Sequence, residues 1–197
     1  MNFKHWLLKE SFSFRNLIKI IDLVQKNMPN QRIVMSKYKE KPIVPNTIFK
    51  VANKPAGGLW YGFGNSWLNF INDDFQSGIK DYIYEIKINP NKILIIDSKI
   101  KHQNFCLKYC KKDTLMNYVI DWNEVAKDFD GIECKGDGFY PWHEEDVANW
   151  QHLWDVESGV IWDKSALLES ELIAEYSPEK REFVPTEYLT NYNNSSS

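Results

Sequence analysis

The carboxylates best placed for chemistry lie in the last third of the chain, among tryptophans. Asp155 and Glu157 belong to the run WDVESGVIWD, and the segment PWHEED places Glu144, Glu145 and Asp146 after a histidine. A carboxylate beside aromatic rings loses hydration, which tunes its pKa for use as a base or hydrogen-bond acceptor. Paired carboxylates also hydrolyse glycosides, whose sugar rings stack on tryptophan. The HEED run is more typical of a solvated loop, so Asp155 and Glu157 are the stronger candidates.

A glycine-rich segment with aromatic residues, KPAGGLWYGFGN, is the second candidate for chemistry. Its glycines are Gly57, Gly58, Gly62 and Gly64. Glycine lets the backbone approach a ligand closely, and backbone amides in such a loop can hold phosphate. The segment contains neither G-x-x-x-x-G-K-[ST] nor G-x-G-x-x-G before a long helix. It therefore indicates a bent entry into a strand about as strongly as an anion site.

Three cysteines and one histidine form the third group. His102, Cys106 and Cys110 recur every four residues, so they would share one face of a helix, and Cys134 could complete a zinc site. Structural zinc ligands usually come in close pairs such as C-x-x-C, which this chain lacks. Packing of the thiols as small apolar groups is favoured, and we expect no metal. An odd, small number of cysteines also fits a reducing compartment.

The overall composition predicts a folded protein that does not coat nucleic acid. The 197 residues are 43% hydrophobic and 26% charged, which suits one domain with a substantial core. The net charge of −3 lacks the basic surplus of nucleic-acid-coating proteins. The basic run from Lys108 to Lys112 is typical of a solvated helix face. We expect one domain over residues 1–190 and a disordered polar tail over 191–197.

The sequence contains no recognisable export signal or membrane span. The opening residues MNFKHWLLKES lack a long apolar core, and the apolar run Ile93 to Ile96 is far too short to cross a bilayer. We therefore expect a cytoplasmic protein without a membrane partner. Delivery into a host cell by a route that leaves no readable signal is the alternative.

Hydrophobic spacing and turn residues predict the elements of the first half of the chain. They are an amphipathic helix over Phe14–Met28, a strand within Gln31–Tyr38, a short strand or turn over Thr47–Asn53, a strand from Leu59, a helix over Ser66–Phe75 and a strand over Ile79–Ile88.

The second half is predicted to mix strands and short helices. The expected elements are a strand over Lys92–Asp97 in a hairpin with the preceding strand, helices over Ser98–Lys111, Asp121–Phe129 and Glu144–Leu153, strands over Asp130–Glu133 and Gly159–Asp163, and a helical or irregular segment over Lys164–Glu175. Because this order lacks the regular alternation of a parallel sheet, it favours an α+β fold.

Four segments occur in an order that resembles a diverged group within the ADP-ribosyltransferase superfamily. They are KPAGGLWYGFGNSW, IYEIKINPNKILIID, FDGIEC and WDVESGVIWD, and the resemblance covers roughly Arg32 to Leu167. It is a resemblance of pattern and order. It implies two small, mostly antiparallel sheets that form a cleft for NAD, with the N-terminal helix and short peripheral helices around them. It implies NAD as the substrate and needs no metal.

The same resemblance implies which residues bind NAD. Ser36 and Lys37, in the early strand RIVMSKY, occupy the place of the residue that fixes the nicotinamide ribose. Tyr61 resembles the residue beside the nicotinamide. Trp60 would wall the pocket, and Gly58 would let the backbone approach the dinucleotide.

The resemblance implies a glutamate as the catalytic residue. Glu157, just ahead of the late strand, resembles it, and Asp155 is the alternative if the register slips by two. When the nicotinamide–ribose bond breaks, positive charge develops on the ribose. A carboxylate hydrogen-bonded to a ribose hydroxyl stabilises that charge.

Three functions follow as hypotheses. The first is an NAD-dependent ADP-ribosyltransferase-like enzyme whose acceptor, whether protein, nucleic acid, small molecule or water, the sequence leaves open. The second is a non-catalytic module that holds a ligand or partner in a tryptophan-lined cleft. The third is a carbohydrate-active protein, which carboxylates facing each other across a groove would favour.

Overall fold

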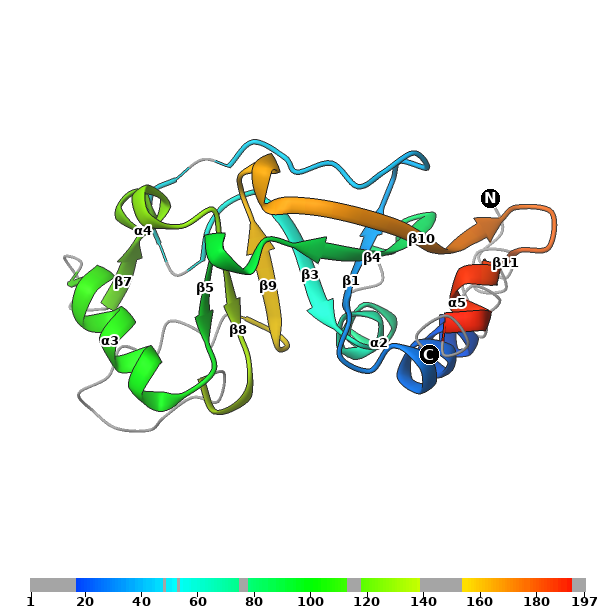
Figure 1. Ribbon diagram of the computed structural model, residues 1–197, viewed down its shortest axis with the longest axis horizontal. Coiled ribbons are helices and arrows are strands. Elements are labelled where there is room, and N and C mark those ends of the chain that lie inside the picture. Colours follow the sequence, from blue (N-terminus) through cyan, green and yellow to red (C-terminus); the bar gives the residue numbers. More distant parts are fainter. Residues whose placement is uncertain are drawn as a thin grey trace, which may run out of the picture. The chain divides into compact units, whose positions relative to one another are not determined.

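The computed structural model describes residues 17–47, 49–52, 54–74, 78–112, 118–138 and 154–192 (Figure 1). The chain divides into two compact units, each with its own hydrophobic core. The first unit comprises Met1–Ile43, Tyr61–Lys87 and Glu169–Ser197, and the second comprises Val44–Trp60 and Ile88–Leu168.

The first unit is built on antiparallel strands with the strand order β11-β10-β4-β1-β3. Strand β1 pairs antiparallel with both β3 and β4, and β10 pairs antiparallel with β11. The strands are β1 (Arg32–Ser36), β3 (Leu59–Phe63), β4 (Tyr82–Ile88), β10 (Leu167–Ser177) and β11 (Glu182–Pro185). The helices are residues 17–27, α2 (Ser66–Asp73) and α5 (Glu187–Asn191).

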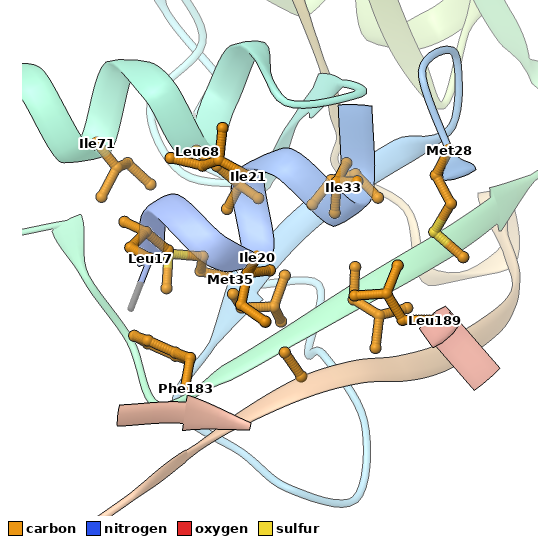
Figure 2. Packing of buried hydrophobic residues seen from close by; sticks show 14 residues of the cluster. Leu17, Ile20, Ile21, Met28, Ile33, Met35, Leu68, Ile71, Phe183 and Leu189 are labelled. Atoms are coloured by element: carbon orange, nitrogen blue, oxygen red, sulfur yellow. The ribbon is translucent and has the colours of Figure 1, made fainter. Parts of the chain in front are cut away.

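The helix over residues 17–27 organises the core of the first unit. Leu17, Ile20 and Val24 recur at helical spacing, and all three are fully buried. Figure 2 shows this helix packed beside α2, which contributes Leu68, and beside β1, which contributes Ile33. The apolar face of the N-terminal helix is therefore buried in the core, as its amphipathic sequence predicts.

The second unit contains both parallel and antiparallel pairing. Strands β9, β8 and β5 lie side by side in that order, with β8 parallel to β5 and antiparallel to β9 (Figure 1). Strand β7 pairs with β2 and β6 in a three-stranded sheet. The elements are β2 (Val51–Ala52), η2 (Pro90–Lys92), β5 (Ile93–Ile96), α3 (Lys99–Tyr109), β6 (Cys110–Lys112), β7 (Tyr118–Asp121), α4 (Trp122–Asp128), β8 (Gly131–Cys134), η3 (Gly136–Gly138), β9 (Ser158–Ile161) and η5 (Lys164–Ala166).

Capping residues stabilise the first turns of the helices of the second unit. The Ser98 hydroxyl accepts a hydrogen bond from the backbone amide of Lys101 at the start of α3. The Asp121 carboxylate accepts one from Asn123 at the start of α4. Each cap satisfies an amide that the first helical turn leaves without an intrahelical partner.

The α+β class is confirmed, and the described residues form one sheet of eight strands and one of three. The predicted hairpin between the strands on either side of Asn89 is wrong. Strand β4 pairs with β1, whereas β5 pairs in parallel with β8. Pro90 starts a 3-10 turn between them, and the all-apolar sequence of β5 is typical of strands in parallel sheets, which are covered on both faces.

The segment Lys164–Glu175 differs from its predicted helical or irregular structure. Its main element is strand β10, which pairs with β11 through contacts such as Ala174 to Pro185. Leucine, alanine and glutamate favour a helix locally. Pairing with neighbouring strands overrides that preference because it buries Ile173 and Ala174 in the first core.

Several predictions lie outside the described residues. They concern the helix over Glu144–Leu153, the PWHEED carboxylates and most of the polar tail. Within the described residues, no helix combines the length and the apolar character that crossing a membrane requires.

Two glycines with the same backbone conformation give a matched test of packing. Gly64 has φ +53° and Gly136 has φ +54°. A Cβ at Gly64 would lie 2.2 Å from the Pro29 carbonyl oxygen, whereas one at Gly136 would lie 3.5 Å from that of Asp97. We expect Gly64→Ala to lower the free energy of unfolding by about 3–5 kcal/mol, from the left-handed backbone and the clash together.

Gly136→Ala carries the backbone penalty alone, about 1–2 kcal/mol. Urea unfolding followed by circular dichroism measures both variants. Equal losses in the two variants would show that the close approach of Pro29 does not matter.

Candidate functional site

The ends of three strands meet at one edge of the second unit. Ile96 of β5 is opposite Cys134 of β8, which is opposite Ser158 of β9. The next residues at this edge are Asp97, which follows β5, Lys135, which follows β8, and Glu157, which precedes β9. The Lys135 amide donates to the Ile96 carbonyl at 3.0 Å, so the pairing continues to this step. Carboxyl ends of parallel strands are frequent ligand sites, and this edge gathers charged side chains.

Glu157 is oriented by a backbone amide of the turn that follows β8. The Gly136 N–H donates to Glu157 Oε1 at 3.1 Å. Gly136 has φ +54°, which glycine adopts without strain. Glu157 is partly exposed, so its carboxylate is both fixed and accessible.

A second carboxylate, Glu133 of β8, is fully buried. The Lys135 ammonium lies 3.3 Å from Glu133 Oε2, and the lysine side chain is 34% exposed. Because side chains alternate along a strand and opposite residues share a face, Glu133, Lys135 and Glu157 project from the same side of the sheet. Glu133 is not among the site residues that the sequence predicts. The signal that could have revealed it is a carboxylate inside the apolar strand of FDGIEC.

Asp97 adds another charge at this edge. Its carboxylate lies 2.8 Å from the Lys101 ammonium, and this hydrogen bond lowers the pKa of Asp97, with a smaller contribution from the charge of Lys135. Asp97 therefore stays ionised over the physiological range.

An aromatic pair belongs to the same unit. The rings of Trp60 and Trp154 meet edge to face with centroids 5.0 Å apart. The Trp60 indole N–H donates to the Gly57 carbonyl at 2.9 Å, and the Lys54 ammonium lies 5.9 Å from the Trp60 ring. Trp154 is buried while Trp60 is half-buried, so Trp60 is the ring of this pair with surface to offer a ligand.

Gly58 is required by packing. A Cβ there would lie 2.6 Å from Val160 Cγ2 and 2.9 Å from the Ile161 carbonyl oxygen, and its φ is +76°. Gly58 thus lets the entry of β3 lie tightly against β9, as the bent strand entry predicted from the sequence requires.

The remaining predicted residues fall in different surroundings. Asp155 is exposed and belongs to the second unit. Ser36, Lys37 and Tyr61 belong to the first unit. The Ser36 hydroxyl accepts from the Tyr38 amide at 3.0 Å, and Lys37 is exposed. Tyr61 is fully buried, with its ring edge to face against Phe63.

The thiols of the second unit lie beside His102 or in the hydrophobic core. Cys106 Sγ lies 3.7 Å from His102 Nε2, and Cys134 belongs to the core. Among the residues that the structure describes, no group of three or more His, Cys, Asp or Glu is arranged to hold a metal ion. Burial, with a smaller contribution from the charge of Glu157, raises the pKa of Cys134 to about 12. Its thiol therefore stays protonated and is a poor nucleophile at neutral pH.

Comparisons of this chain with models of known protein families, with curated proteins and with solved structures found no match.

The raised pKa of Cys134 predicts a loss of stability in alkali. An exposed thiol has a pKa near ~8.5, so the unfolded chain releases this proton at lower pH than the folded chain. The stabilisation is complete below about pH 8.5 and is lost as the pH rises towards 12. We expect wild type to lose about 1–2 kcal/mol more than Cys134→Ala between pH 8 and pH 10.

Urea unfolding of both proteins at the two pH values measures this difference. The cavity left by the alanine is the same at both values, so it cancels. A difference between the proteins that does not change with pH would contradict the assignment.

Proposed function

We propose that this protein is an ADP-ribosyltransferase-like enzyme that cleaves the nicotinamide–ribose bond of NAD and transfers ADP-ribose to an acceptor. The observation that carries the proposal is the Glu157 carboxylate directly before β9, oriented by the Gly136 amide at 3.1 Å. The unit that holds Glu157 also holds the Trp60–Trp154 pair. The order of the sequence segments resembles that superfamily and supports the same reaction.

Glu157 would act on the charge that develops during bond cleavage. The bond between the ribose carbon and the nicotinamide nitrogen breaks, and its electron pair leaves with nicotinamide. Because Gly136 holds Oε1, Oε2 is the oxygen that would accept a hydrogen bond from a ribose hydroxyl and stabilise the positive ribose. The acceptor then forms a bond to the ribose carbon, and its proton passes to Glu157.

Trp60 would bind a flat ring of the dinucleotide. Its indole N–H is held by the Gly57 carbonyl, which fixes the ring plane before a ligand arrives. Gly58 of the same unit remains a proposed NAD-binding residue, and Asp155 remains the alternative to Glu157. The roles of Ser36, Lys37 and Tyr61 stay predictions from the sequence resemblance.

A non-catalytic binding module is the second candidate. The burial of Tyr61 favours it, because a ring without exposed surface does not stack on nicotinamide unless the strand rearranges. Such a module would use Trp60 and the charged edge to hold a ligand without turning it over.

A charge-removing substitution tests the enzyme proposal. Glu157→Gln keeps the size of the side chain and its hydrogen bond from Gly136 but removes the negative charge. We expect it to lower the kcat for nicotinamide release by about 10²–10³-fold, with little change in NAD affinity. Asp155→Asn is the matched control, and we expect it to retain activity. Chromatography of nicotinamide measures turnover, and calorimetry measures NAD binding.

The outcomes separate the candidates. Wild-type protein that neither binds NAD nor releases nicotinamide would end the enzyme proposal. NAD binding without turnover in wild type and in Glu157→Gln alike supports the module. Loss of turnover in Asp155→Asn alone would transfer the catalytic role to Asp155.

Trp60 provides a separate test of ligand stacking. Trp60→Leu removes the aromatic face, and we expect it to raise the KM for NAD by about tenfold. Trp60→Phe keeps an aromatic ring but loses the N–H that donates to Gly57. Its KM should therefore lie between the KM of wild type and that of Trp60→Leu. A KM for Trp60→Leu equal to that of wild type would remove Trp60 from the site.

A further inference from the structure

Lys135 lies between two carboxylates that project from the same side of the sheet. Glu133 of β8 precedes it by two residues, and Glu157 is opposite it when the β8–β9 register is extended by one residue beyond Cys134 and Ser158. The Lys135 ammonium lies 3.3 Å from Glu133 Oε2. Gly136, the residue after Lys135, donates a hydrogen bond from its backbone amide to Glu157 Oε1. The lysine therefore contacts one of these carboxylates and neighbours the residue that holds the other.

Burial explains why the lysine lies at Glu133. Glu133 is 0% exposed, and a buried carboxylate without a compensating charge is strongly disfavoured. Glu157 is partly exposed and retains hydration, so it gains less from the same cation. The Lys135 side chain is 34% exposed, and its ammonium lies 3.3 Å from the buried Glu133 oxygen.

We propose that Glu133 is a positioning residue that draws the Lys135 ammonium away from Glu157, so that the Glu157 carboxylate stays available to the substrate. This inference rests on the proposed function of Glu157. Lys135 also has Asp97 as a neighbour on the β5 side, but the Asp97 carboxylate is already paired with the Lys101 ammonium at 2.8 Å. Without the Glu133 charge, the ammonium would therefore be attracted to Glu157 on the β9 side. The resulting ion pair would occupy the oxygen that accepts the ribose hydroxyl and would cancel the charge that stabilises the positive ribose.

The test is a pair of nested variants. Glu133→Gln releases Lys135, and we expect kcat for nicotinamide release to fall by about tenfold or more while KM for NAD changes little. Glu133→Gln/Lys135→Met removes the competing cation as well, and we expect kcat within about threefold of wild type. A residue that acts directly in the chemistry would not be rescued by loss of the lysine.

A matched control separates this effect from loss of any lysine–glutamate pair. Lys87 and Glu169 form an ion pair at 2.7 Å with both side chains about 60% exposed, in the first unit. Glu169→Gln should leave kcat and KM unchanged. A loss like that of Glu133→Gln would show that the effect is not specific to the Glu133 position.

A spectroscopic measurement keeps the inference separate from the enzyme proposal. The carboxyl carbon resonance of Glu157 should move in Glu133→Gln, as Lys135 pairs with it, and should return in the double variant. This readout does not need turnover. If wild type lacks activity on NAD, the proposed function fails while the resonance still tests the restraint on Lys135.

The overturning results are definite. An unchanged Glu157 resonance in Glu133→Gln overturns the proposal, as does a double variant whose kcat is as low as that of the single variant. Should Glu133→Gln fail to fold, the double variant decides, because it removes both charges of the pair and leaves no buried ion uncompensated. A tenfold loss of kcat in that variant would then overturn the proposal.

Discussion

The register that joins β8 to β5 on one side and to β9 on the other is the constraint on which the charged edge depends. A shift by one residue would turn every side chain of β8 to the opposite face. With the register observed, Cys134 enters the core while Glu133 and Lys135 project from the face shared with Glu157. The backbone hydrogen bonds of three strands thus determine that Glu133 and Glu157 are the neighbours of Lys135 on this face.

Glu85 in the first unit and Glu133 in the second are buried carboxylates of the eight-stranded sheet, and each is satisfied differently. In the first unit Glu85 of β4 accepts hydrogen bonds from the hydroxyls of Tyr188, at 2.6 Å, and Tyr192, at 3.3 Å, which are neutral donors. In the second unit Glu133 meets the ammonium of Lys135. Neutral donors tie the C-terminal residues to β4 and leave the charge in place. The Lys135 ammonium compensates the negative charge of Glu133. Because the ammonium is also attracted by other carboxylates nearby, a change in this ion pair affects those carboxylates.

Local patterns predict elements better than they predict partners. The spacing of Leu17, Ile20 and Val24 predicts the N-terminal helix because a 3.6-residue period places those side chains on one face. The same reasoning fails for β5, where turn residues at Asn89 suggested a hairpin and the strand instead pairs with β8. It also fails for Leu167–Ser177, whose helix-favouring residues form β10. In both cases the structure of the segment depends on pairing with a strand elsewhere in the chain, and the local spacing of apolar residues does not identify that strand.

The sequence alone determined the α+β class, the helices that begin at Ser98 and Asp121 and the position of Glu157 ahead of a strand. These features depend on residues close together in the chain, through side-chain periods and hydrogen bonds that span a few residues. Tertiary structure decided that Tyr61 is buried and that Glu133 and Lys135 share a face with Glu157. Strand pairing brings together segments more than twenty residues apart, as the hydrogen bond from Gly136 to Glu157 illustrates, and the choice among partners follows from which pairing buries the most apolar surface.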